Sequence, residues 1–242
     1  MMRLTRRDLA FLAGALLGAA GCARLGVWQL DRLHQRRARN AEIAAARARP
    51  PILVAGRGLS ADSAADRRLL ARGAFDYDRE TIWPGRTHQG VPGVDLVTPL
   101  RLPDGSAVLV DRGWVPSSDG MRVDRAHYRE ADSAELEGLG RPAPRGRGDV
   151  DPNFFGDSVP YGLLPFVIQQ LPSSPTLARP RPRPTGSPLG TESFIRRLSP
   201  PVLDDGPHLS YAIQWFSFAT IILVGTGALM FKRRPGREVT TI

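Results

Sequence analysis

The sequence predicts an α+β membrane protein in which two transmembrane helices flank a β-rich extracytoplasmic domain. The first observation is a run of 23 uncharged residues, Leu209 to Phe231, followed by Lys232-Arg233-Arg234. At about 1.5 Å of rise per residue, a helix of this length spans a hydrocarbon core of roughly 30 Å. The second is an apolar run near the N-terminus, Leu9 to Ala23. The third is a set of short β-like runs between the two helices.

We expect the first transmembrane helix over residues 9–30. Its uncharged run of 15 residues is short for a span, so a cleaved signal peptide stays open beside a retained anchor. Residues 5–9 resemble a twin-arginine export signal, and residues 19–22 loosely resemble a lipoprotein cleavage site that lacks its usual leucine. We favour the retained helix, because residues 25–30 extend the apolar run and Arg24 can reach the outer face of the membrane.

The β-rich domain is predicted over residues 31–207. A solvent-exposed helix is expected to continue over residues 31–49 until Pro50-Pro51 ends it. The runs that predict strands are 69–75, 80–83, 94–102, 107–110, 134–139 and 165–171. The turn 103–106 joins two of them into a hairpin, and Pro99 inside its first arm favours an edge position or a bulge. The proline-rich stretch 172–190 predicts a loop or spacer.

Composition excludes several classes of function. The formal net charge is +9, but the arginines are scattered and form no zinc-finger or aromatic-basic RNA motif, so we expect no nucleic-acid partner. Cys22 is the single cysteine, which excludes an intrachain disulfide and a CxxC motif. No P-loop, dinucleotide fingerprint, HExxH or EF-hand pattern occurs.

The distribution of basic residues predicts the topology. The arginines of residues 1–8 and the basic residues of 232–242 favour two cytoplasmic termini. The arginines at 32–39 favour the opposite orientation. We expect a protein of the cell (inner) membrane, with residues 1–8 and 232–242 in the cytoplasm. The second span is expected over residues 208–231, and the central domain is expected to be extracytoplasmic.

Three blocks of sequence together resemble the SURF1 family of cytochrome c oxidase assembly factors. They are Gly26-Val27-Trp28-Gln29-Leu30-Asp31-Arg32, the stretch 90–116 with its Asp111-Arg112-Gly113-Trp114, and His208-Leu209-Ser210-Tyr211-Ala212-Ile213-Gln214-Trp215-Phe216. The resemblance implies a non-enzymatic, two-span inner-membrane protein that assists assembly of haem-copper oxidase. It further implies that haem a is bound transiently and presented to oxidase subunit I, so the implied partners are subunit I, the haem a synthesis machinery and membrane lipid.

The resemblance assigns the candidate haem site to the start of the second helix. His208 matches the family histidine proposed to contact haem, and a neutral imidazole can ligate haem iron. Tyr211, Trp215 and Phe218 follow it at i+3, i+7 and i+10, on one helix face. Gln214 lies roughly 9 Å further along the axis and is a candidate for contacts to haem substituents or to the first helix. The alternative for these residues is an ordinary aromatic belt at the membrane interface.

Two residues outside this helix are further candidates. Arg112 can pair with a haem propionate, because a guanidinium suits carboxylates, or it can form a structural salt bridge. His34 is a speculative second axial ligand that the family pattern does not support. A solvated helix surface is the alternative for His34.

Two other classes of function were compared with the haem carrier. Residues 155–158 resemble the first block of GDSL esterases, and Asp205 with His208 fits their D-x-x-H. Only 50 residues separate Ser158 from His208, too few for the parallel α/β domain that such a triad needs. We therefore predict no enzymatic activity. A membrane scaffold that binds oxidase subunits without touching haem stays open.

Overall fold

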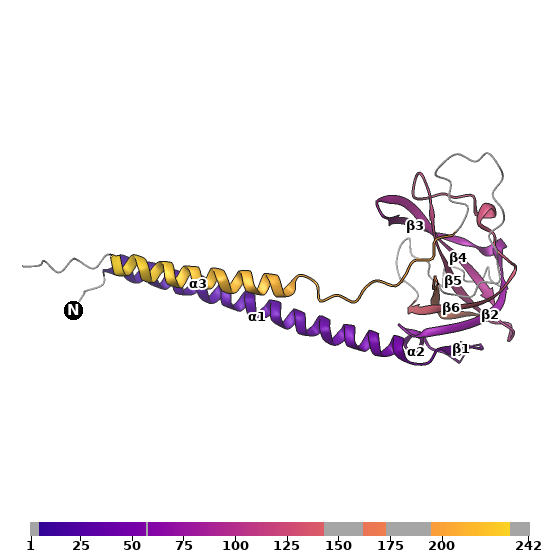
Figure 1. Cartoon of the computed structure of the whole chain (residues 1–242), viewed down its shortest axis with the longest axis horizontal. Helices are drawn as coiled ribbons and strands as arrows, with labels where there is room; N and C mark the ends of the chain where they lie inside the picture. Colours follow the sequence, from indigo (N-terminus) through magenta and orange to yellow (C-terminus); the bar gives the residue numbers. More distant parts are fainter. Residues whose placement is uncertain (1–4, 57, 143–161, 173–194, 233–242) are drawn as a thin grey trace, which may run out of the picture. The chain divides into compact units, whose positions relative to one another are not determined.

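The computed structural model of the chain describes residues 5–56, 58–142, 162–172 and 195–232. The chain divides into two compact units, one formed by Met1–Glu42 with Leu203–Ile242 and one formed by Ile43–Val202. The first unit consists of helices and the second is rich in β-structure (Figure 1). The predicted α+β class, with two long apolar helices at the ends of a β-rich segment, is confirmed.

The helical unit contains α1 (Arg6–Ala48) and α3 (His208–Lys232), which lie side by side (Figure 1). Both are long and apolar enough to cross a membrane. A reciprocal capping pair starts α1, because the Thr5 hydroxyl accepts from the Asp8 N–H at 3.2 Å and the Asp8 carboxylate accepts from the Thr5 N–H at 3.0 Å. The helix continues past the apolar run and ends just before Pro50-Pro51, as the sequence predicts.

Alanine and glycine, together with one leucine, line the contact between the two helices. The buried residues of α1 are Ala19, Gly26 and Leu33, and those of α3 are Ala212 and Ala219. Each set repeats every seven residues, which is the spacing of two helices packed at a shallow angle. A Cβ atom at Gly26 would lie 2.7 Å from the Phe216 ring. The glycine therefore lets the two backbones approach closely, as in many membrane helix pairs.

The described residues of the β unit form seven strands and three short helical turns. The strands are β1 (Ile52–Val54), β2 (Arg68–Phe75), β3 (Thr81–His88), β4 (Val91–Arg101), β5 (Ala107–Pro116), β6 (Ser133–Pro142) and β7 (Leu163–Gln170). The helical turns are α2 (Ala61–Ala64), η1 (Tyr77–Arg79) and η2 (Arg125–Tyr128). All six predicted strand runs are confirmed, and β1 and α2 are additions that the sequence did not predict.

Five of the strands form a closed ring. The sheet order is β1-β2-β6-β7-β5-β4-β3, and a further pairing of β2 with β4 closes the ring through Ala74 opposite Arg101 and Phe75 opposite Leu100. Gly73 stands at this junction, where a Cβ atom would lie 2.1 Å from the Arg101 carbonyl oxygen. The absence of a side chain at Gly73 therefore allows β2 to pass from β6 to β4.

The interior of this barrel is apolar and follows the period of two expected of strands. The core residues from the five ring strands are Leu69, Ala71, Phe75, Leu100, Val108, Val110, Ala134, Leu136, Leu164, Phe166 and Ile168. Alternate residues of β5 and β7, such as Leu109 and Val167, form a smaller cluster on the outer face. Both faces of β5 are therefore covered, and nine of its ten residues are buried.

The hairpin of β4 and β5 is confirmed, but Pro99 does not mark an edge strand. β4 pairs with β5 on one side and with β3 on the other, and its register with β5 shifts between Leu96 and Val97. The pairing with β3 stops at Val97, so Pro99 lies beyond the last residue that β3 pairs. Its missing N–H therefore costs no ladder hydrogen bond there. The predicted spacer 172–190 lies almost wholly outside the described residues.

Candidate functional site

His208 is the first residue of α3, and its ring bonds to the other long helix. Pro207 precedes it, and the Pro207 carbonyl accepts from the Tyr211 N–H at 3.1 Å and from the Ser210 hydroxyl at 2.8 Å. His208 Nδ1 lies 2.9 Å from Oε1 of Gln29 on α1. Both side chains are half-buried. The two helices are thus joined by one polar contact at the start of α3.

This contact leaves the second ring nitrogen of His208 available. A carboxamide oxygen only accepts hydrogen bonds, so Nδ1 carries the hydrogen and Nε2 keeps its lone pair. Within the described part of the chain, Nε2 makes no hydrogen bond. An imidazole in this state has the chemistry of a metal ligand that donates its other N–H to a neighbouring group. The donor chemistry therefore fits the iron of a haem.

The aromatic residues that follow His208 present an open apolar surface. The side chains of Tyr211 and Phe218 are 45% and 49% exposed, whereas Trp215 is half-buried. The rings of Trp215 and Phe218 meet edge to face with centroids 5.9 Å apart. A flat, largely apolar macrocycle and the acyl chains of a bilayer both suit such a surface.

Gln214 lies on a different face of α3 from His208. Their positions in the sequence differ by six. At about 100° of rotation per residue, this offset places the two side chains about 120° apart around the helix axis. The Gln214 side chain is exposed, and it makes no hydrogen bond within the residues that the structure describes. The structure therefore separates Gln214 from the surface next to His208, and its contact with haem stays a prediction.

Ion pairs connect the chain just before α3 to α1. Arg36 pairs with Asp204 at 2.6 Å, and Arg37 pairs with Asp205 at 2.7 Å. Asn40 donates to the Asp204 carbonyl at 2.7 Å. All these groups are largely exposed, so each pair contributes little to stability. Their effect is to keep the start of α3 beside α1.

The geometry argues against a hydrolase triad. Asp205, the expected orienting acid, is engaged by Arg37, and Nδ1 of His208 is engaged by Gln29. The expected nucleophile, Ser158, lies outside the described residues. His34 is exposed on α1 and stays a speculative ligand. Within the described residues, no group of three or more His, Cys, Asp or Glu residues could hold a metal ion.

Arg112 belongs to the β unit, where protein groups surround it completely. Its side chain is 0% exposed. Nε donates to the Thr98 hydroxyl at 2.9 Å, one terminal nitrogen donates to the Tyr128 carbonyl and to Glu130, and the other pairs with Glu80. This arrangement supports the structural alternative for Arg112. The pairing with a haem propionate stays a prediction.

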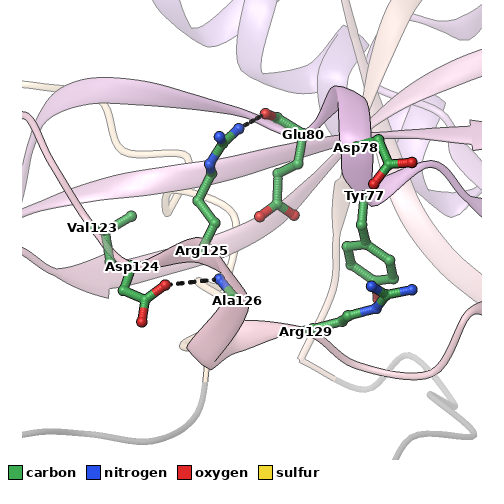
Figure 2. Close-up of a pocket in the computed structure, with 8 residues that line it drawn as sticks. All are labelled: Tyr77, Asp78, Glu80, Val123, Asp124, Arg125, Ala126 and Arg129. Carbon is green, nitrogen blue, oxygen red and sulfur yellow. Dashed lines mark hydrogen bonds between the residues drawn. The ribbon is translucent and has the colours of Figure 1, made fainter.

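A polar cavity of about 480 Å³ lies next to this network (Figure 2). Glu80, η1 and the segment that contains η2 line it, and Arg125 donates to the Glu80 carbonyl. The guanidinium of Arg129 stacks over the Tyr77 ring at 4.8 Å. Acidic and basic groups alternate around the cavity, so its charge favours no single class of ligand. No cavity at these residues was predicted from the sequence.

A smaller cavity of about 220 Å³ on the same unit contains two aspartates. Asp111 and Asp95 come from the neighbouring strands β5 and β4. Burial raises the pKa of Asp111 to about 7, and the nearby Asp95 carboxylate adds to the shift. Burial also raises the pKa of Asp95, although Arg86 pairs with it at 3.1 Å.

Sequence reasoning missed the contact of Gln29 with His208, and it missed the two ion pairs of Arg36 and Arg37. Gln29 was part of the first SURF1-like block, but its partner lies 179 residues away. The sequence did contain one signal for the ion pairs, because Arg36-Arg37 follows the first apolar segment and Asp204-Asp205 precedes the second. Charges of opposite sign beside the same end of two apolar segments indicate that the two segments lie side by side.

The chain combines two apolar helices, which the hydrogen bond between His208 and Gln29 joins, with a unit built on a small β-barrel. This combination is typical of a two-helix membrane protein with a β domain. The chain belongs to the SURF1 family, whose family model matches residues 16–220. A SURF1-like protein of Monosiga brevicollis is 28% identical over 88% of this chain and 83% of its own length. An uncharacterized SURF1-like protein of Mycobacterium bovis is 27% identical over 88% of this chain and 79% of its own length. Membership of this assembly-factor family implies a role in cytochrome oxidase assembly.

Proposed function

We propose that this protein binds haem a at His208 and assists its insertion into subunit I of a haem-copper cytochrome c oxidase. The observation that carries the proposal is the state of His208, whose Nδ1 is engaged by Gln29 while Nε2 is open. Tyr211 and Trp215 would contact the ring from the same helix. His208 would hold a bound haem through Nε2, and the haem would supply the iron that this nitrogen ligates.

The arrangement suits a carrier that must release its ligand. The proposal assigns one protein ligand, His208, to the haem iron, and within the described residues no group of three or more His, Cys, Asp or Glu residues could hold a metal ion. Binding through one protein ligand is weaker than binding through two, so transfer to a site with more ligands is favoured. The proposal does not depend on Gln214 or Arg112, whose positions give it no support.

The membrane orientation is part of the proposal. Basic residues at both ends of the chain support cytoplasmic termini and a β domain on the outer side of the inner membrane. In this orientation, residues 31–207 are extracytoplasmic and His208 lies at the outer end of its span. A largely apolar macrocycle would reach the imidazole from the bilayer. The partners would be oxidase subunit I and the haem a synthesis machinery.

The test is the optical spectrum of the full-length protein purified after co-expression with haem a synthesis enzymes. We expect haem a in the wild type, and a lost or shifted spectrum in His208→Ala. His127→Ala is the matched control, because His127 is exposed in the β unit and should leave the spectrum unchanged.

A correctly inserted wild-type protein without haem a would contradict the proposal. That result would favour the alternative role, a membrane scaffold that binds oxidase subunits without touching haem. An unchanged spectrum in His208→Ala would also contradict the assignment of the ligand, because haem would then be bound elsewhere.

A further inference from the structure

Gln29 is a half-buried polar side chain at the end of the apolar run of α1, just before Asp31 and Arg32, and an amide removed from water there needs a partner. An amide in a hydrocarbon environment loses its hydrogen bonds to water, and this penalty is offset only by a partner within the protein. The partner that the structure provides is Nδ1 of His208, at 2.9 Å. The pair is therefore a specific polar contact that lies between the packing of Gly26 against Phe216 and the ion pairs of Arg36 and Arg37.

The packing of α1 directs Gln29 toward α3. Gly26, three residues earlier, and Leu33, four residues later, are both buried. Positions 26, 29 and 33 share one face of the helix, since residues at i, i+3 and i+7 lie above one another. Gly26 brings the backbone of α1 close to the Phe216 ring. Gln29 is thereby held within reach of the His208 ring.

The hydrogen bond determines which nitrogen of His208 is available. A neutral imidazole without partners exchanges between two tautomers, and its ring can rotate. An acceptor fixed at Nδ1 selects the tautomer in which Nε2 has the lone pair, and it also fixes the plane of the ring. Metal-ligating histidines commonly donate their second N–H in this way, and the acceptor also raises the basicity of the ligand.

We propose that Gln29 is the positioning residue of His208: its amide oxygen holds the Nδ1 hydrogen and leaves Nε2 oriented for the iron of the haem. This inference rests on the proposed function. It adds that the ligand is complete only while α1 and α3 are paired, because its two halves come from different helices. Separation of the helices would then weaken the ligand, which gives a partner a means of releasing the haem.

The experiment compares the wild type with Gln29→Leu and Gln29→Glu in the full-length protein. Gln35→Leu is the matched control, because Gln35 is an exposed glutamine on the same helix that, within the described residues, bonds to Arg32 alone. The first readout needs no haem: nitrogen NMR of the His208 ring reports its tautomer and its titration. The second readout is the affinity for added haem a, together with the iron–histidine stretching frequency of the ferrous complex.

We expect Gln29→Leu to lose the single tautomer and to bind haem about 10- to 100-fold more weakly, with a lower stretching frequency. Gln29→Glu can only accept a hydrogen bond, so it should keep the tautomer and raise the stretching frequency. Gln35→Leu should match the wild type in both readouts.

Two results would overturn the inference. One is a Gln29→Leu protein whose tautomer and iron–histidine frequency equal those of the wild type. The other is loss of the tautomer in Gln29→Glu, because it would show that the amide donates to Nδ1. A wild type that binds no haem, with its tautomer still dependent on Gln29, would instead refute the proposed function and leave the contact between the two helices in place.

Discussion

Arg112 in the β unit and His208 in the helical unit are both polar groups that are at least partly removed from water, but their hydrogen-bonding capacity is used differently. All three nitrogens of the Arg112 guanidinium meet protein acceptors, among them Glu80, Glu130 and the Tyr128 carbonyl. His208 uses one nitrogen, on Gln29. The guanidinium is sealed from solvent, whereas the imidazole is half-buried at the start of a helix.

The difference follows from charge. A buried cation without partners is very costly, so a permanently charged guanidinium in a protein interior must have its donors satisfied. A neutral imidazole costs much less to leave half-satisfied, and its free lone pair remains available to a ligand. Incomplete satisfaction therefore identifies His208 as the better candidate for binding, although the sequence placed both residues in the haem site.

The largest effect expected from this comparison is that of Arg112→Met. Removal of the cation leaves Glu80, at 3% exposure, without its ion-pair partner and with the Thr98 hydroxyl as a remaining donor, so we expect the β unit to lose about 3–5 kcal/mol of stability. Chemical denaturation of the full-length protein in detergent, followed by circular dichroism of the β signal, measures this loss. Arg72→Met is the control, because Arg72 also pairs with a glutamate but is 71% exposed, and its loss should change the stability far less. Equal effects of the two changes would contradict the structural role of Arg112.

The second prediction tests whether the His208 contact depends on the close approach of the helices. In Gly26→Ile the new side chain overlaps the Phe216 ring, and overpacking of this kind typically costs about 1–3 kcal/mol. We expect the helices to separate locally, with loss of the hydrogen bond between Gln29 and His208 in the nitrogen NMR spectrum. In Gly14→Ile no atom lies within 4 Å of the new Cβ, so the spectrum should not change. A His208 signal that is unaffected by Gly26→Ile would show that the contact tolerates a wider helix pair.

The smallest effect concerns Asp111. Like Arg112 it is buried, but like His208 it has only part of its hydrogen-bonding capacity satisfied. It accepts from the Gly113 N–H at 3.0 Å, and Asp95, Arg86 and Arg141 are the charged groups that act on it. Its folded-state pKa of about 7 lies above the unfolded value, so the folded state binds the extra proton and stability falls as the pH rises through neutrality. Between about pH 6 and pH 8 the fall should be about 1 kcal/mol.

Asp111→Asn removes this titration while keeping an oxygen for the Gly113 N–H. We therefore expect a flatter dependence of the melting temperature on pH, with the mutant gaining relative to the wild type at alkaline pH. An unchanged pH profile would show that Asp111 titrates in its ordinary range.

Local patterns predicted most of the elements. The uncharged length of α3 and the strand period of β4 and β5 are visible in consecutive residues, because a membrane span and a half-buried strand each need a fixed spacing of apolar side chains. The end of α1 was likewise predicted, because proline cannot continue a helix. The closure of the ring through Gly73 and the parallel pairing of β5 with β7 were not predicted. They join segments far apart in sequence, and no local pattern encodes such pairings.

The candidate site shows the same division. His208 was found because a histidine at the start of an apolar helix is conspicuous and matches a family block. Gln29 was seen in another block but was not paired with it, because the contact depends on the register of two helices. The sequence left two roles open for Arg112, and only the surrounding carboxylates show that its donors are occupied. Gln214 shared a segment with His208, but helix geometry turns it to another face.

The closed ring of β strands also bears on how this protein can work among unassembled polypeptides. A sheet with exposed edges can add strands from other chains, which leads to aggregation. Here the five ring strands have neighbours on both sides, and the sheet order ends at β1, of only three residues, and at β3, whose register shifts between Trp83 and Arg86. A short strand and an irregular one are poor templates for further pairing. The domain is therefore suited to stay close to unassembled polypeptides without exchanging strands with them.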